Sequence, residues 1–347
     1  MNSRFVPASR AGAPDAPRSV VIHHTITRPI DRVLAWAAAA ALVVTVVTFL
    51  GREYWLFELT THFRLHLAVG ATGLMVLAAV RRRPAVMLLV LITAAANVIP
   101  LLPYLMQGAI GAHAAPLSAR IMFANVNFRN SAYAEALALI SSEGPDIVGL
   151  AEVNHSWIDG LSELRERYPH RVVRPDDGAW GLALFSRFPV RELDSSPYSE
   201  GDVQTAIIVE VELHGKPVTL TLAHLRSPVS QDNANLRNVQ IDTIATMAKR
   251  NKQAQIVIGD LNLTPWSPYF APFEKAGLIN VARGRGYKAT FPAGLGYFGI
   301  PIDHLLLSDH LQVHGWRTST LFGSDHLPII ADIAFADFGA EAAKQVQ

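Results

Sequence analysis

The stretch "IVIGDLNLTP", residues 256–265, joins a strand of buried character directly to charged and amide side chains. Its first residues are apolar and β-branched, which predicts a short strand inside a folded domain. Asp260 and Asn262 follow at once, although a buried carboxylate is costly unless a cation or hydrogen-bond donors offset its lost solvation. The stretch therefore predicts either a functional strand end or an Asx turn that caps the next segment.

The same arrangement recurs between residues 120 and 335, where short apolar runs end or begin at polar side chains. These side chains are Asn125, Asn127, Glu152, His224, Asp260, Asn262, Asp303, His304, Asp325 and His326. Ligand sites of α/β folds gather at strand ends, so we expect most of these side chains to meet in one pocket. We expect His304, which is next to Asp303, to be structural.

A hard divalent cation would offset the negative charge of such a cluster. Carboxylate and amide oxygens suit Mg²⁺, with Mn²⁺ as an alternative, and Mg²⁺ leaves room for a substrate phosphate. The chain has no Cys, which excludes disulfides, thiolate metal sites and Cys nucleophiles. Zinc fits less well, because no His pair has helical ligand spacing.

Residues 120–335 alternate between strand-like and helix-like segments. The runs "TAIIVEVEL" (205–213) and "PVTLTLAHL" (217–225) predict adjacent strands joined by a hairpin turn. Helical periodicity predicts helices over residues 130–143, capped by Asn or Ser, over residues 233–250, and over residues 267–278 with a Ser cap. Strands in runs and strands alternating with helices favour a layered α/β sandwich with mixed sheets.

The N-terminal third has a different character. Residues 1–30 are rich in Ala, Pro, Ser and Arg, which predicts a flexible tail. Three apolar runs follow, Val33–Leu50, Leu65–Val80 and Ala85–Met106, and about 20 apolar residues cross a bilayer core of roughly 30 Å. We predict an all-α membrane anchor of three transmembrane helices over residues 31–108. A globular domain over 116–336 and a tail over 337–347 complete the chain; a cleaved signal peptide is the alternative for the first run.

The arginines predict the orientation of this anchor. They precede the first apolar run and separate the second from the third, at Arg4, Arg10, Arg18, Arg28, Arg32, Arg81, Arg82 and Arg83. Positive charge is retained on the cytoplasmic side, so the N-terminus and the Arg81–Arg83 loop should be cytoplasmic. With three spans, a multi-pass protein of the cell membrane then carries its globular domain on the outer, periplasmic or extracellular face. This placement on the outer face fails if the second apolar run does not span the membrane, because the number of spans is then even.

The charge of the chain is unevenly distributed. Residues 1–115 carry 10 Lys and Arg against 4 Asp and Glu, whereas residues 116–347 carry 20 against 25. The globular part is therefore mildly acidic, while backbone binding to nucleic acid draws on many cationic contacts. Nucleic acid is possible as a substrate but is not favoured by charge.

Six motifs occur in order, "NVN" (125–127), "LAEV" (150–153), "AHL" (223–225), "GDLN" (259–262), "IDHLLL" (302–307) and "SDHLP" (324–328). Together they resemble the endonuclease/exonuclease/phosphatase superfamily, whose DNase I-like fold is a four-layer α/β sandwich. The resemblance covers roughly Arg120 to Phe335. It implies a metal-dependent phosphoric ester hydrolase.

The resemblance also implies roles for particular residues. Asn125, Glu152 and Asp325 would hold Mg²⁺ or Mn²⁺. Asp260 and Asn262 would orient the attacking water and hold a phosphate oxygen. His326 would contact the phosphate or act as a base, supported by Asp303, and His224 would lie next to the leaving oxygen. Asn127 departs from the pattern, because many relatives carry an acid there, and this puts a second metal site in doubt.

The leading hypothesis is a membrane-anchored Mg²⁺-dependent phosphoesterase that hydrolyses a phosphodiester or phosphomonoester by in-line attack of water, with a lipid headgroup as a possible substrate. The alternatives are a DNase I-like nuclease, a non-catalytic envelope scaffold that keeps the fold, and a transporter or sensor in which the spans are primary. No protein partner is inferred. The uncharged run Phe291–Pro301 is either a packed loop or a lip that touches substrate or bilayer.

Overall fold

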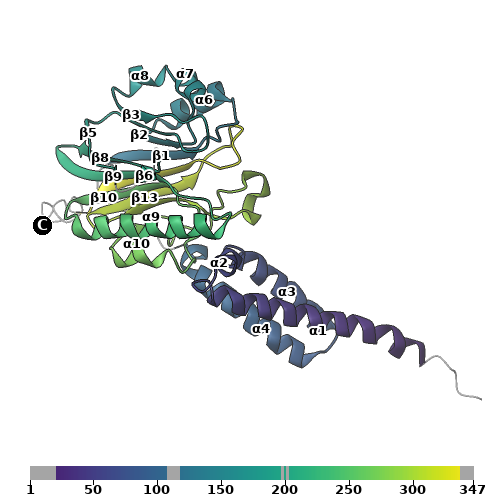
Figure 1. Cartoon of the computed structure of the whole chain (residues 1–347). Helices are drawn as coiled ribbons and strands as arrows, with labels where there is room; N and C mark the ends of the chain where they lie inside the picture. Colours follow the sequence, from purple (N-terminus) through teal and green to yellow (C-terminus); the bar gives the residue numbers. More distant parts are fainter. Residues whose placement is uncertain (1–20, 108–117, 197–198, 201–202, 337–347) are drawn as a thin grey trace, which may run out of the picture.

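The structure, a computed structural model, describes residues 21–107, 118–196, 199–200 and 203–336. The predicted tails over residues 1–20 and 337–347 lie outside the described residues. Figure 1 shows a helical part at the N-terminus and a larger α/β part stacked in layers beside it.

Two six-stranded mixed sheets form the centre of the α/β part. In order across the first sheet lie β13 (Leu311–Thr318), β14 (Ile329–Phe335), β1 (Ala119–Asn125), β2 (Ile147–Ala151), β4 (Leu182–Ser186) and β3 (His170–Arg174). Across the second lie β11 (Ile279–Asn280), β12 (Asp303–Leu307), β10 (Ala254–Asp260), β9 (Lys216–His224), β8 (Ala206–Leu213) and β5 (Val190–Glu192). The short strands β6 (Ser199–Glu200) and β7 (Val203–Gln204) pair separately.

Helices cover the outer face of each sheet (Figure 1). The first sheet is covered by α6 (Tyr133–Glu143), α7 (His155–Gly160) and α8 (Leu164–Arg167), and the second by α9 (Gln231–Arg250) and α10 (Ala271–Lys275). Buried apolar side chains form one core between the sheets and one core under each helical layer. The predicted four-layer α/β sandwich is confirmed.

Local sequence explains some boundaries and fails at others. The predicted hairpin joins β8 to β9 through His214 and Gly215, which both have positive φ, as a two-residue hairpin turn requires. The predicted side-chain cap of α6 is wrong, because Ala132 occupies the N-cap position without a side-chain hydrogen bond. The helix predicted over residues 267–278 is also too long: Ser267 donates its hydroxyl to Glu58 of the helical part, and α10 spans only Ala271–Lys275.

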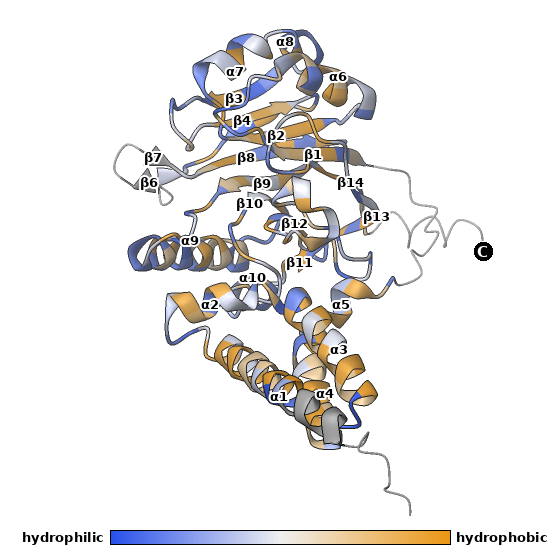
Figure 2. Cartoon of the chain, turned by 90° about the vertical axis from the view of Figure 1, so that its right-hand side faces the viewer, coloured by the Kyte–Doolittle hydropathy of each residue, from blue (hydrophilic) through white to orange (hydrophobic). Residues whose placement is uncertain are grey.

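The N-terminal part consists of α1 (Val21–Phe49), α2 (Trp55–Thr61), α3 (Arg64–Val80), α4 (Pro84–Val98), η2 (Ile99–Leu101) and α5 (Leu102–Leu105). Residues 21–30, which the sequence assigns to the tail, are helical. Figure 2 shows that α1, α3 and α4 are hydrophobic over most of their length. Two segments of the described chain, Pro29–Phe49 and Pro84–Leu105, are long and apolar enough to cross a membrane. A third span exists only if α2 and α3, bent by 63°, count as one.

Polar side chains tie these helices together. Arg64 at the start of α3 donates to the carbonyls of Thr48 and Ala96, near the C-terminal ends of α1 and α4. Asn97 of α4 donates to the Thr45 hydroxyl of α1 over 2.8 Å. Such bonds satisfy polar groups that would otherwise be buried without partners. The helices therefore form a packed bundle.

Helix α2 is docked on the α/β part through buried polar contacts. Arg237 of α9 binds the Glu58 carboxylate at 2.6 Å, and both side chains are fully buried. The indole of Trp266 donates to the Thr61 carbonyl over 2.8 Å, and its ring packs on Tyr104 of α5. Because Trp266 follows the "GDLN" motif closely in sequence, the helical bundle contacts the chain next to the strand-end cluster.

Candidate active site

The predicted site residues converge where strands of the two sheets end. β1 and β2 are parallel neighbours in one sheet, and β9 and β10 are parallel neighbours in the other, so their carboxyl ends lie at the same edge. β12 runs antiparallel to β10, and this pairing sets Asp303 opposite Asp260. The face-to-face packing of the sheets brings both sets of strand ends together.

The Asn125 side chain links the two sheets. Its amide nitrogen donates to Oε1 of Glu152 over 2.9 Å and to Oδ2 of Asp260 over 3.3 Å. Its Oδ1 accepts the backbone N–H of Asn127 over 3.0 Å. Two carboxylates from different sheets therefore share one amide group.

His326 lies beside the same cluster. Its Nδ1 is 2.9 Å from Oδ2 of Asp303, and its Nε2 is 3.8 Å from Oδ2 of Asp260. The backbone N–H of His326 donates to the Ser324 hydroxyl, which itself donates to the Asn125 carbonyl over 2.7 Å. The imidazole is thus oriented by a carboxylate on one side and presented to Asp260 on the other.

His224, at the end of β9, also lies beside Asp260. Its Nε2 is 3.7 Å from Oδ2 of Asp260, and its ring lies 5.2 Å from that of Trp180. The guanidinium of Arg226 lies 4.1 Å from the centre of the Trp180 ring, on its face. Both histidines therefore point at the same carboxylate.

Asn127, Asp325 and Asn262 complete the set of predicted residues. The Asn127 amide donates to Oδ1 of Asp325 over 2.9 Å, at a more exposed position. The Asn262 backbone N–H donates to Asp260, and its side-chain amide donates to the Leu225 carbonyl over 2.9 Å. Asp260 and Asn262 therefore form the Asx-type bond that the sequence allows, within the cluster itself.

The backbone is strained at three of these positions. Asn127, Glu152 and Asn262 have φ values of 56°, 62° and 51°, in the left-handed region that side chains normally avoid. Such residues cost about 1–3 kcal/mol each and gather at functional sites. Gly259 is required sterically, because a Cβ there would lie 1.8 Å from the Ala223 carbonyl oxygen. The strand ends are held in a geometry that local propensity does not favour.

Burial and neighbouring charge shift the pKa values of the cluster. Burial, with the nearby Asp303 carboxylate, raises the pKa of Asp260 to about 8, and burial raises the pKa of Glu152. Burial alone would lower the pKa of His326, but the Asp303 and Asp260 carboxylates outweigh it and raise the value to about 10. Burial and the positive His326 lower the pKa of His224 to about 4. At neutral pH His326 is charged and His224 is neutral.

The sequence profile of the Endonuclease/Exonuclease/phosphatase family matches residues 122–326, more than half of the chain. The chain belongs to this family. Members of the endonuclease/exonuclease/phosphatase family are phosphoesterases that generally depend on a divalent metal, so the chain is an enzyme of the phosphoric ester hydrolase class. No curated protein sequence matches the chain.

Solved structures share the fold at low identity. An AP endonuclease from Archaeoglobus fulgidus superposes with a TM-score of 0.52 at 16% identity, over 62% of this chain and 99% of that one. TDP2 of D. rerio, humanized by 14 mutations, gives 0.51 at 19% identity, over 62% and 99%. Truncated TDP2 of Caenorhabditis elegans gives 0.50 at 20% identity, over 63% and 98%. At such identities the likeness concerns the fold alone.

The donors of this family member suit a hard divalent cation. Glu152, Asp260 and Asp325 offer carboxylate oxygens, and the Asn125 amide oxygen keeps a second lone pair beside its bond to Asn127. Ligand atoms of Asp260, Asp303 and His326 lie within 4.8 Å of one another. Because Asp303 already binds His326, the carboxylates that remain for a cation are those of Glu152 and Asp260, whose oxygens keep lone pairs beside the hydrogen bonds that they accept.

Sequence reasoning missed several residues of the cluster. Trp180 lies beside His224 and carries Arg226 on its ring, Phe291 lies 4.7 Å from the His326 ring, and Ser324 joins His326 to Asn125. Ser324 is the first residue of the motif "SDHLP" and Arg226 directly follows "AHL", so their positions in the sequence were a usable signal. Phe291 opens the uncharged run that the sequence indicated as a packed loop or a lip. Trp180 carries no local signal, because only tertiary packing brings it near. His304, expected to be structural, is buried and binds the Leu263 carbonyl and Asn280.

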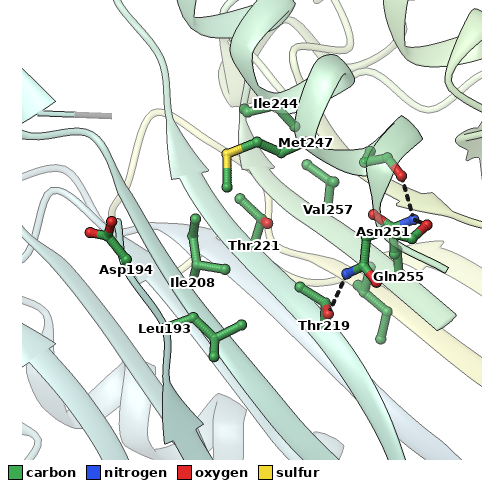
Figure 3. Close-up of a pocket in the computed structure, with 12 residues that line it drawn as sticks. Leu193, Asp194, Ile208, Thr219, Thr221, Ile244, Met247, Asn251, Gln255 and Val257 are labelled. Carbon is green, nitrogen blue, oxygen red and sulfur yellow. Dashed lines mark hydrogen bonds between the residues drawn. The ribbon is translucent and has the colours of Figure 1, made fainter. Parts of the chain in front are cut away.

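An enclosed cavity exists elsewhere, between α9 and the second sheet (Figure 3). It has a volume of about 130 Å³, and its lining includes Thr219 and Gln255 from the beginnings of β9 and β10. Its polar groups bind one another, as in the 2.7 Å bond from Asn251 to Thr219. The cavity lies at the opposite end of these strands from the acidic cluster and has none of its chemistry.

Proposed function

We propose that the protein is a membrane-anchored, Mg²⁺-dependent phosphoesterase whose substrate is a phosphate ester of a membrane lipid. The observation that carries the proposal is the single Asn125 amide that joins Glu152 and Asp260, with the His326–Asp303 pair directly beside them. Carboxylates, an oriented imidazole and an amide in one buried cluster are the groups that phosphate ester hydrolysis needs.

The acidic residues have distinct roles in this proposal. Asn125, Glu152 and Asp325 would hold the cation, which when bound would neutralise charge on the phosphate. Asp260 orients the attacking water and, in its ionised form, accepts a proton from it. Asn262 holds the Asp260 carboxylate through its backbone N–H. This arrangement supports attack in line with the leaving group.

The two histidines both lie beside Oδ2 of Asp260 and have different roles. His326, kept protonated by Asp303, donates to a phosphate oxygen as an imidazolium, which favours phosphate contact over action as a base. His224 is neutral at the same pH and donates a hydrogen bond near the leaving oxygen. The neutral and charged forms follow from their different neighbours, not from their residue type.

The helical bundle supports the membrane part of the proposal. Asp31 of α1 pairs with Arg81 and Arg83, which lie between α3 and α4. The beginning of α1 and the turn between α3 and α4 lie at the end of the bundle remote from the α/β part (Figure 1). The positive-inside rule assigns that end to the cytoplasm and therefore the α/β part to the outer face. A site held at the outer surface of a bilayer encounters lipid phosphate groups at high local concentration.

A nuclease is the second candidate, because the solved relatives of the same fold include an enzyme named as an AP endonuclease. The excess of 25 acidic over 20 basic residues in 116–347 opposes it, since DNA binding depends on many cationic contacts.

The test uses the full-length protein in nanodiscs with Mg²⁺ or EDTA. Substrates are bis(p-nitrophenyl) phosphate, phosphatidic acid, phosphatidylglycerol and single- and double-stranded DNA. The proposal expects Mg²⁺-dependent turnover of the soluble ester and of a lipid, abolished by Asp260→Asn. Turnover of DNA alone would select the nuclease, and no turnover of any substrate would reject catalysis.

A further inference from the structure

The short helical segment η4 (Ala293–Phe298) exposes large apolar side chains beside the site. Leu295, Tyr297 and Phe298 are 56%, 75% and 56% exposed. The whole run from Phe291 to Pro301 has no charged residue. Exposed apolar side chains clustered on one loop mark an interaction surface, since scattered ones are common but grouped ones are costly in water.

This segment rests on the end of the helical bundle. His66 of α3 binds the Phe298 carbonyl oxygen over 2.8 Å, and its ring lies 6.1 Å from that of Phe298. The ring of Phe63, half exposed just before α3, lies 5.5 Å from that of His66. The exposed surface of η4 is therefore continuous with the N-terminal end of an apolar helix that the proposed function places in the bilayer.

The same segment is bonded to the site. The backbone N–H of Ala293 donates to the Asp325 carbonyl over 2.7 Å, and Phe291 lies against His326. Leu327 donates to the Thr290 carbonyl over 2.8 Å. A shallow cavity of about 160 Å³ behind Tyr297 is lined also by Lys288, whose ammonium suits an anionic headgroup. The segment thus reaches from the bundle to the catalytic cluster within one short loop.

We propose that η4 is a membrane lip, in which Leu295, Tyr297 and Phe298 enter the headgroup region of the bilayer and open the site toward lipid phosphate groups. Aromatic and aliphatic side chains are favoured at that depth, whereas charged ones are not, and the lip has none. The occupant is the bilayer that holds α1 and α4. This inference rests on the proposed membrane anchoring and phosphoesterase activity, and it specifies how the substrate reaches the site.

The absence of Cys allows a direct test of bilayer contact. Tyr297→Cys in the full-length protein is labelled with bimane and reconstituted in vesicles of phosphatidylcholine and phosphatidylglycerol that contain nitroxide-labelled lipid. Lys249→Cys is the matched control, because it is exposed in the last turn of α9, at the opposite end of β10 from the site. We expect the nitroxide-labelled lipid to quench the bimane at position 297 strongly and the bimane at position 249 little. Equal quenching at both, or none at 297, overturns the lip.

A second measurement tests the effect on substrate use. The variant Leu295→Ser, Tyr297→Ser, Phe298→Ser should lower turnover of vesicle lipid about tenfold, because apolar contact with the bilayer is lost. Its turnover of bis(p-nitrophenyl) phosphate should stay within about twofold, since none of the three side chains belongs to the acidic cluster. An equal fall on both substrates, or no fall on lipid, overturns the lip. Failure of the wild type on the soluble ester would instead reject the proposed function, and quenching would still report on the lip.

Discussion

The two ends of β9 and β10 both carry buried polar residues, which are neutral at one end and ionisable at the other. At the beginning of the strands, Thr219, Asn251 and Gln255 bond to one another and to backbone carbonyls around a small cavity. At the carboxyl ends, Asp260 and His224 lie among further charged groups and have displaced pKa values. A defined cavity is present at the first end and the reactive chemistry at the second.

The difference separates polarity that stabilises a fold from polarity that is kept for a ligand. A satisfied amide network has no remaining donor or acceptor to offer, and it stabilises the layer packing. A buried carboxylate whose pKa is raised, on a backbone with positive φ, is maintained at a cost in stability. The cavity at the beginning of these strands is therefore a poor guide to the function of the chain.

The largest expected effect is on catalysis at the site end. Asp260→Asn removes the proton acceptor while preserving shape, and we expect kcat to fall by about 10³-fold or more. The matched control is Asp194→Asn, the same substitution at an exposed residue lining the cavity of the other end. Its kcat should stay within about twofold. Comparable losses in both variants would break the contrast between the two ends.

A somewhat smaller effect is expected for the pair that orients the imidazole. Asp303→Asn keeps the hydrogen-bonding shape but removes the charge that holds His326 protonated, so we expect kcat to fall by about 10²-fold. The fall should grow as the pH is raised, because the variant imidazole then loses its proton. Steady-state kinetics from pH 6 to 9 check this, and a pH profile parallel to that of wild type would contradict the role of Asp303.

The carboxyl ends of β9 and β10 are also joined to the helical bundle. Arg237 donates to the Asn262 carbonyl over 3.1 Å and binds Glu58 of α2, with both charged side chains fully buried. Glu58→Ala leaves a buried guanidinium unpaired, which should lower the free energy of unfolding by about 3–5 kcal/mol. The exposed Glu53→Ala, in the preceding turn, should change it by less than about 0.5 kcal/mol. Equal denaturation curves for the two variants would contradict a stabilising role of the Glu58–Arg237 ion pair.

The last expected effect is a dependence of stability on pH in EDTA. Although burial lowers the pKa of His326, its carboxylate partners raise it to about 10, from 6.5 when unfolded. The stabilisation is complete below pH 6.5 and is lost as the pH rises toward 10, because the unfolded chain releases this proton first. The melting temperature should therefore decrease over this range, and His326→Gln should flatten the decrease. An unchanged slope in the variant would show that other groups cause it.

The sequence predicted the layered fold and the members of the cluster for a physical reason. Apolar runs that stop at Glu152 or Asp260 identify buried strands and the edge where they end, and parallel neighbours must share that edge. It could not predict contacts that only packing creates, such as Trp180 on His224 or Arg237 on Glu58. The same limit explains why α10 is short. The Ser267 hydroxyl, which the sequence predicted as a helix cap, instead donates a hydrogen bond to Glu58, 209 residues away in the sequence.

Binding of Mn²⁺ to the full-length protein, followed by electron paramagnetic resonance, tests most directly the claim that this cluster is built for a divalent cation. Glu152→Gln keeps the volume of the side chain and removes its charge. We expect the wild type to bind Mn²⁺ saturably and Mg²⁺ to compete with this binding. The affinity for Mn²⁺ should be at least about tenfold lower in Glu152→Gln. No binding by the wild type, or equal binding by the variant, would contradict the claim.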